Sequence, residues 1–121
     1  MYVDGFLIPV PIDKKDAYIE AARYAAAVHM DHGTTRIVEC WEDNVPEGEH
    51  TSFPMAVKKE EGEVVVFSWI EYPDKATRDA CHAASMADPR FADPDMSAVP
   101  FDPKRLIFGG FTPILEERLA E

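Results

Sequence analysis

Two glutamates, each two residues away from a tryptophan, are the strongest candidates for chemistry in this sequence. Glu39 precedes Trp41 in the run RIVECWED, and Trp69 precedes Glu71 in the run EVVVFSWIEY. Both runs have the β-branched and aromatic composition of strands, in which residues two apart lie on one face. We therefore expect each carboxylate to lie beside an indole ring on a sheet. That arrangement can mark a pocket, and it can equally be ordinary packing beside a solvated edge.

One strand register would bring the two pairs together. If the strands pair antiparallel with Trp41 opposite Trp69, Glu39 comes opposite Glu71. Two adjacent carboxylates in a partly apolar pocket raise the pKa of one of them, which leaves one acid and one base or cation ligand. On this register we predict Glu39 and Glu71 as catalytic residues. The alternative is another register, in which each glutamate is hydrogen-bonded or solvated separately.

Further residues are predicted to bind a ligand. Trp41 and Trp69 would form an aromatic floor for a planar molecule, with Tyr72 beside them; the favoured alternative is that both tryptophans belong to a dimer core. Arg90 and Arg105 flank a proline-rich segment that could carry a cation over the sheet edge, to neutralise the glutamates or to bind an anionic substrate. Salt bridges at the surface or an interface are the favoured alternative for both arginines.

The sequence predicts neither a metal nor a cofactor. His29 and His32 have a spacing compatible with one metal ion, but no further ligand cluster supports it, and histidines at a helix end also cap carbonyls. Cys40 and Cys81 are the only cysteines and lie outside any CxxC spacing, so we interpret both as small buried apolar residues.

Composition and charge indicate a protein without membrane-spanning segments that is not expected to bind nucleic acid. The chain has 121 residues, of which 23 are acidic and 12 basic, for a formal net charge of -11. This charge repels phosphate, so nucleic acid and anionic membranes are not expected as partners. No apolar run approaches the ~20 residues that span a bilayer. The N-terminus lacks the basic and apolar segments of a secretory signal, and we expect a cytoplasmic location.

The pattern of strands and helices predicts one domain over residues 1–121. Strands are expected at 2–10, 35–43, 64–72 and 105–111, with helices at 14–31 and 75–87 that begin after Asp13 and Asp74 as N-caps. The first helix should bury Tyr18, Ala21, Ala22, Ala25 and Val28, and the second should turn Ala76, Ala80, Ala83, Ala84 and Ala87 towards the sheet. Residues 44–62 form a long connection with a short strand near 55–57, which could be a lid or an arm, and residues 88–104 form a proline-rich connection.

The order βαββαβ predicts an α+β, ferredoxin-like fold, with both helices on one face of a four-stranded antiparallel sheet. The other face should then be polar in a monomer, but the strands are apolar on both sides. Val65, Phe67 and Trp69 oppose Val64, Val66 and Ile70, for example. A second copy of the sheet is the simplest cover for this face, and we expect a homodimer.

Four segments carry a family resemblance. YVDGFLIPVP, RIVECWEDNVP, FSWIEYPDK and KRLIFGGF, spread over residues 2–111, resemble the YbaA-like family of uncharacterised bacterial proteins. The resemblance implies a ferredoxin-like protomer that pairs through its sheet into a dimeric α/β barrel. It implies no established reaction, and related barrels include cofactor-free monooxygenases, haem enzymes and small-molecule binders.

Three functions are compatible with these residues. The first is a homodimer with a small-molecule pocket. The second is a cofactor-free oxygenase- or isomerase-like enzyme that uses Glu39 or Glu71 for proton transfer. The third is a structural or regulatory interaction protein without a small ligand. We place binding first because the family resemblance implies no nucleophile, metal set or cofactor motif.

Overall fold

The computed structural model describes residues 1–120 as one antiparallel sheet with helices. In chain order the elements are β1 (Tyr2–Pro11), the 3-10 turn η1 (Ile12–Lys14), α1 (Lys15–Asp31), β2 (Arg36–Trp41), α2 (Phe53–Ala56), β3 (Glu63–Tyr72), α3 (Lys75–Met86), α4 (Pro89–Ala92) and β4 (Ile107–Phe111). The strand order β2-β3-β1-β4 and the antiparallel pairing are those of a ferredoxin-like fold, which confirms the predicted α+β class.

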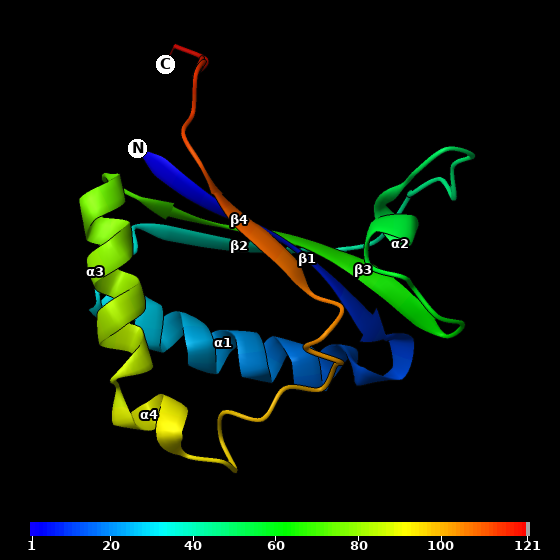
Figure 1. The fold of residues 1–121 in the computed structure, drawn as a ribbon, viewed down its shortest axis with the longest axis horizontal. Helices are drawn as coiled ribbons and strands as arrows, with labels where there is room; N and C mark the ends of the chain where they lie inside the picture. Colours follow the sequence, from blue (N-terminus) through cyan, green and yellow to red (C-terminus); the bar gives the residue numbers. More distant parts are fainter. Residues whose placement is uncertain (121) are drawn as a thin grey trace.

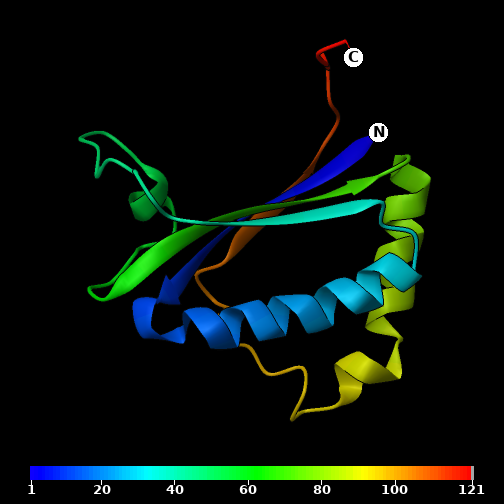
Figure 2. The ribbon, with the colours of Figure 1, turned by 180° about the vertical axis from the view of Figure 1, so that it is seen from behind.

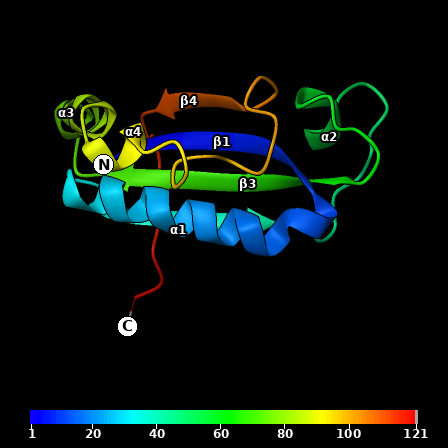
Figure 3. The same ribbon diagram turned by 90° about the horizontal axis from the view of Figure 1, so that it is seen from below.

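Both long helices lie on one face of the sheet, as predicted, but they cover it differently. α1 runs beneath the sheet along its length, whereas α3 stands across one end (Figures 1 and 2). Seen from below, α1 lies over the β3 side, and α3 lies beyond the strand ends (Figure 3). The middle of the sheet therefore has only one helix beneath it.

The prediction for the buried stripe was correct for α1 and wrong for α3. In α1, Tyr18 and Val28 are buried and the intervening stripe alanines are half-buried. In α3, four of the five alanines expected against the sheet are exposed, and the buried residues are Cys81 and Ser85. The reason is that polar groups on this face of α3 have partners in β1 and α1, so burial does not require an apolar stripe.

Local signals at helix starts were partly correct. Asp74 caps α3 by accepting a hydrogen bond from the backbone N–H of Thr77, as predicted. Asp13 is not a cap, because it lies inside η1 and α1 begins two residues later. The short strand expected near residues 55–57 is instead the helical turn α2, which starts at Ser52 as N-cap and has Pro54 in its first turn.

The face of the sheet opposite α1 is largely uncovered, and we call it the open face. α2 and its neighbours cover one end of it, where Phe53 packs edge-on against Phe67. Apolar side chains nevertheless remain accessible on this face: Phe67, Ile107 and Phe111 are 47%, 43% and 63% exposed. Within residues 1–120, no helix is long and apolar enough to cross a membrane.

Candidate functional site

The strand register separates the two glutamates. Val38, not Trp41, lies opposite Trp69, and Glu39 lies opposite Ser68. The register with Glu39 against Glu71 is therefore wrong by three residues. Because side chains alternate along a strand, an odd shift turns one strand's residues to the other face. Glu39 and Trp41 face α1, whereas Trp69 and Glu71 lie on the open face, so neither the carboxylate pair nor the two-tryptophan floor forms within one chain.

Glu71 is held by its own neighbours on the open face. Its Oε2 accepts hydrogen bonds from the indole Nε1 of Trp69 at 2.8 Å and from Nη1 of Arg36 at 3.3 Å. The Arg36 guanidinium also lies over the Trp69 ring. The predicted proximity of Glu71 and Trp69 is thus present as a hydrogen bond, and Arg36 supplies the cation beside Glu71.

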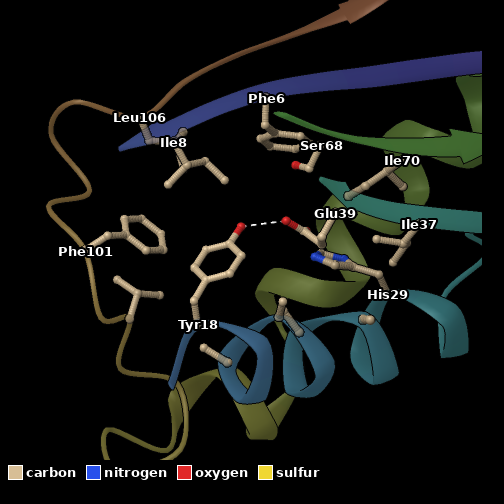
Figure 4. Close-up of a pocket in the computed structure, with 15 residues that line it drawn as sticks. Phe6, Ile8, Tyr18, His29, Ile37, Glu39, Ser68, Ile70, Phe101 and Leu106 are labelled. Carbon is tan, nitrogen blue, oxygen red and sulfur yellow. Dashed lines mark hydrogen bonds between the residues drawn. The ribbon is translucent and has the colours of Figure 1, made fainter. Parts of the chain in front are cut away.

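A pocket lies between α1 and the sheet, and Glu39 is in its wall. The cavity has a volume of about 160 Å³ and is closed on one side by the segment that leads into β4 (Figure 4). Apart from polar side chains treated below, its wall consists of Phe6, Ile8, Ala21, Ala22, Ala25, Ala26, Ile37, Ile70, Val99, Phe101 and Leu106. The alanines of α1 create the space, because their side chains end at Cβ and do not reach the sheet.

Glu39 and Tyr18 form the polar centre of this pocket. The Tyr18 hydroxyl donates a 2.6 Å hydrogen bond to Oε1 of Glu39 (Figure 4). Glu39 is an exposed residue because β2 is an edge strand, but the apolar wall deprives its carboxylate of hydration. This desolvation raises the pKa of Glu39 and outweighs the lowering by the Tyr18 hydroxyl. Burial and the Glu39 charge in turn raise the pKa of Tyr18, which therefore stays a hydrogen-bond donor.

His29 and Ser68 complete the polar part of the wall. Ser68 is buried and lies directly opposite Glu39 across the β2–β3 ladder. Nδ1 of His29 lies 3.2 Å from Oγ of Ser85 in α3, which orients the imidazole. Burial, together with the nearby charge of His82, lowers the pKa of His29. The imidazole is therefore neutral at pH 7 and can accept or donate one hydrogen bond.

A second polar cluster surrounds Asp4 where α3 meets β1. Asp4 is fully buried and accepts hydrogen bonds from Arg78, Tyr72 and His82. Although burial acts to raise the pKa of Asp4, the hydrogen bonds from these three side chains outweigh it and keep this pKa below its ordinary value. Every carboxylate oxygen has a partner, so this cluster fixes α3 on the sheet and offers no open position to a ligand.

The other residues predicted to bind a ligand lie outside the pocket. Tyr72 is buried and donates to Asp4. Trp41 packs beside the core of Ile8, Val10, Tyr18 and Val66. Arg90 is paired with Asp31 and Asp88, and Arg105 with Glu63 and Asp102. These salt bridges agree with the favoured alternative, and a role of these residues in binding stays a prediction.

Sequence reasoning missed His29 and Ser68 as pocket residues and treated Tyr18 only as part of a buried stripe. A signal was present for two of them: Tyr18 and His29 are polar-tipped residues on the alanine stripe of α1, three turns apart. His32, by contrast, points to Asp88, so the two histidines do not converge. Among residues 1–120, no three histidine, cysteine, aspartate or glutamate side chains group as metal ligands.

Comparison with known proteins identifies the family. Residues 1–103 match the model of a family described as protein of unknown function (DUF1428). The chain belongs to this family. Two relatives, uncharacterized protein YbaA of Escherichia coli (strain K12) and that of Shigella flexneri, are each 56% identical to it over 116 residues. Each match covers 96% of this chain and 98% of the relative, which confirms the predicted YbaA-like family.

A solved structure shows the same fold. An uncharacterized NIPSNAP domain protein from Burkholderia xenovorans matches with a TM-score of 0.58 at 17% identity, over 97% of this chain and 100% of that chain. At this identity the similarity establishes the fold of the DUF1428 chain and says nothing of its chemistry.

Proposed function

We propose that this protein binds a small, mostly apolar molecule with one hydrogen-bonding group in the pocket between α1 and the sheet. The observation that carries the proposal is the hydrogen-bonded Glu39–Tyr18 pair in a cavity whose wall, apart from His29 and Ser68, is otherwise apolar. A cavity of about 160 Å³ suits a ligand of one ring, since an apolar protein cavity of ~150 Å³ accommodates benzene. No lysine or arginine is among the described residues of the wall, which favours neutral ligands over anions.

Glu39 sets the polar requirement of the ligand. As a carboxylic acid it donates one hydrogen bond, and as a carboxylate it accepts from a ligand hydroxyl. Tyr18 occupies Oε1, so Oε2 is the oxygen that such a ligand would meet. A phenol or a cyclic ketone of one ring satisfies both size and polarity.

The test is binding of phenol to the full-length protein by calorimetry and thermal shift. Ala25→Leu fills the pocket, and Ala27→Leu makes the same change at an exposed position of α1. We expect phenol to raise the unfolding temperature of the wild type and of Ala27→Leu, with at least tenfold weaker binding to Ala25→Leu. Benzoate, of similar size but charged, should bind more weakly than phenol. Equal binding to the two leucine variants, or none to the wild type, would contradict the proposal.

A second candidate function is proton transfer at the same site. The raised pKa of Glu39 and the lowered pKa of His29 describe two proton-carrying groups of the pocket that its apolar surroundings shift towards their neutral forms. The carboxylate of Glu39 would take a proton from the carbon beside a ketone and return it to the enolate, which is an isomerase-type step. Glu71 has no part in it, because it lies on the other face.

Deuterium incorporation into cyclohexanone in D₂O, followed by NMR, tests this candidate. Wild-type protein should accelerate exchange ~10²-fold or more relative to Glu39→Gln. Glu20→Gln, an exposed glutamate of α1, is the matched control and should exchange as the wild type does. Equal rates for the wild type and Glu39→Gln would leave binding as the function of the pocket.

We propose further that two copies form a homodimer through their open faces. Phe67, Ile107 and Phe111 are too exposed and too close together for a face that stays in water. Burial of such a face contributes ~25 cal/mol per Å² to association. Sedimentation at micromolar concentration should show a species of twice the 13.6 kDa chain mass.

Two variants locate the interface. Ile107→Asp should shift the dimer towards monomer, whereas Met86→Asp, on the exposed side of α3, should not. A wild-type monomer at 13.6 kDa would refute the dimer. A dimer that responds to Met86→Asp and not to Ile107→Asp would place the interface elsewhere.

A further inference from the structure

The C-terminal segment of the described chain, residues 112–120, is an extended tail with apolar side chains in water. It has no helix or strand, and Ile114, Leu115 and Leu119 are 98%, 78% and 96% exposed. Single exposed apolar residues are common, but three lie within six positions here, and Ile114 and Leu115 are adjacent. Within residues 1–120 of one chain, nothing buries these three side chains.

The tail leaves the sheet on the side of the open face. It continues from β4, whose residues Ile107 and Phe111 lie on that face. Figures 1 and 2 show it rising from the sheet on the side opposite α1. The tail would therefore meet any partner that covers the open face. It begins at the edge of the proposed interface.

An apolar groove on the open face is large enough to receive such side chains. It has a volume of about 300 Å³ and is lined by residues of β1, β3, β4 and α2. Its wall is formed by Gly5, Phe6, Leu7, Phe53, Phe67, Ile107, Phe108, Gly109 and Phe111. None of these side chains is polar, so an isoleucine or leucine bound in the groove would contact only apolar groups and would bury no charge.

The length of the tail argues for contact with a second copy. Nine extended residues reach ~30 Å, whereas two sheets packed face to face are ~10 Å apart. A tail that starts at the edge strand β4 therefore crosses the gap and still has several residues to lay on the opposite copy. Two-fold symmetry makes the contact reciprocal, so each copy gives one tail and receives one.

We propose that the tail of each copy clasps the other copy, with Ile114 and Leu115 in the partner's open-face groove. The inference rests on the proposed homodimer. It adds the tail, residues 112–120, to the interface, which would be incomplete without it. It assigns a role to apolar residues that contribute nothing to the fold of a single chain. The clasp also covers Phe111 at the point where the tail begins.

Sedimentation equilibrium of tail variants tests the clasp. Ile114→Asn with Leu115→Asn should raise the dimer dissociation constant at least tenfold, and truncation after residue 111 should raise it at least as far. Glu116→Gln with Glu117→Gln changes the same tail without touching its apolar residues and should leave the constant within about twofold. Ile114, Leu115, Glu116 and Glu117 are exposed in the monomer, so we expect the substituted chains to keep its fold.

A photoreactive benzoylphenylalanine at position 114 identifies the surface that the tail touches. In a mixture of heavy- and light-isotope chains, we expect cross-links between chains, to groove residues such as Leu7 or Phe67. A monomeric wild type would refute the homodimer itself. A dimer with unchanged affinity in the asparagine variant, or cross-links only within one chain, would refute the clasp and leave the homodimer standing.

Discussion

Glu39 shows how one side chain acquires chemistry from its surroundings. It is one of many glutamates in an acidic chain, and it differs in facing an apolar cavity with a phenol as hydrogen-bond partner. Because the apolar wall removes water from the carboxylate, the charged form is disfavoured and the pKa of Glu39 is raised. The same desolvation suits Glu39 to carry a proton. It also means that ionisation of Glu39 lowers the free energy of unfolding.

Glu39→Gln should therefore change the pH dependence of stability. The folded protein holds this proton more tightly than the unfolded chain does, so the wild type loses stability as pH rises from the ordinary value of 4.5 through the raised pKa. The glutamine amide of the variant cannot ionise, and its oxygen can still accept a hydrogen bond from Tyr18. Denaturant unfolding between pH 4 and 8 should show a difference that increasingly favours the variant. A difference between Glu39→Gln and the wild type that stays constant with pH would contradict the raised pKa of Glu39.

Asp4 is the opposite case, a buried carboxylate that is fully paired. Asp4→Asn should cost about 2–3 kcal/mol at pH 7, because the Arg78 guanidinium and the His82 imidazole lose their shared charged partner. The pKa of Asp4 is lowered, so its contribution is present above pH 3.8 and fades as pH falls below that value.

Urea unfolding at pH 7 and pH 3 measures this effect. Asp79→Asn is the matched control, since Asp79 also pairs with Arg78 but is exposed, and it should change stability little. An Asp4→Asn variant as stable as the wild type at pH 7 would show that the cluster does not hold α3 in place.

At the scale of elements, α1 and α3 divide the covered face between them. The alanine stripe of α1 leaves a cavity under the sheet, while α3 closes one end by polar contacts rather than apolar packing. The junction between α1 and β2 has to pass close to α3. Gly33 lies at this junction. Its φ is positive, at 113°, and it lies next to the side chain of Thr77.

Gly33→Ala should destabilise the fold by about 2–3 kcal/mol. The positive φ alone costs ~1–2 kcal/mol for a residue with Cβ, and a Cβ at Gly33 would lie only 2.8 Å from Cγ2 of Thr77. Gly62→Ala is the control, because Gly62 has a φ of 81° and open space around it. Thermal unfolding should show the smaller loss at Gly62. Thr77→Ser removes the methyl group that the new Cβ would meet. It should therefore restore part of the stability lost in Gly33→Ala, and it should change the stability of the wild type little.

The element scale also shows where prediction from sequence succeeded. Strands and helices were predicted because period-two and period-3.6 apolar patterns are local properties, as in β3 and α1. The β2–β3 register was not predictable, because the long connection between these strands imposes no turn geometry. The polar face of α3 was missed for a similar reason: Arg78 and His82 turn towards the sheet because Asp4, more than seventy residues earlier, accepts their hydrogen bonds.

For the whole molecule, the dominant features are the open face and the net charge. Two copies of a chain with a charge of -11 repel each other while their apolar faces attract. The repulsion acts over a Debye length of ~10 Å at 0.1 M salt, whereas apolar burial is not screened.

The proposed homodimer should therefore be stabilised by salt. Between 20 and 300 mM NaCl we expect the dissociation constant to fall roughly threefold or more, because screening weakens the repulsion between the acidic copies. Sedimentation equilibrium at three salt concentrations measures it, and the clasp variant Ile114→Asn with Leu115→Asn should keep the same slope. A dissociation constant that rises with salt would mean that ion pairs across the interface outweigh the net charge.

The sequence by itself determined the family, the order of the four strands and the two long helices, and the presence of apolar residues on both faces of the sheet. These follow from local periodicity and from long matching segments, which need no knowledge of distant contacts. Only the tertiary structure decided that Glu39 belongs to a pocket with Tyr18 and that Glu71 does not. The physical reason is that the face on which a side chain lies depends on the strand register. The register in turn depends on packing between strands that are far apart in the chain. A shift of a single residue is enough to move a carboxylate to the opposite face.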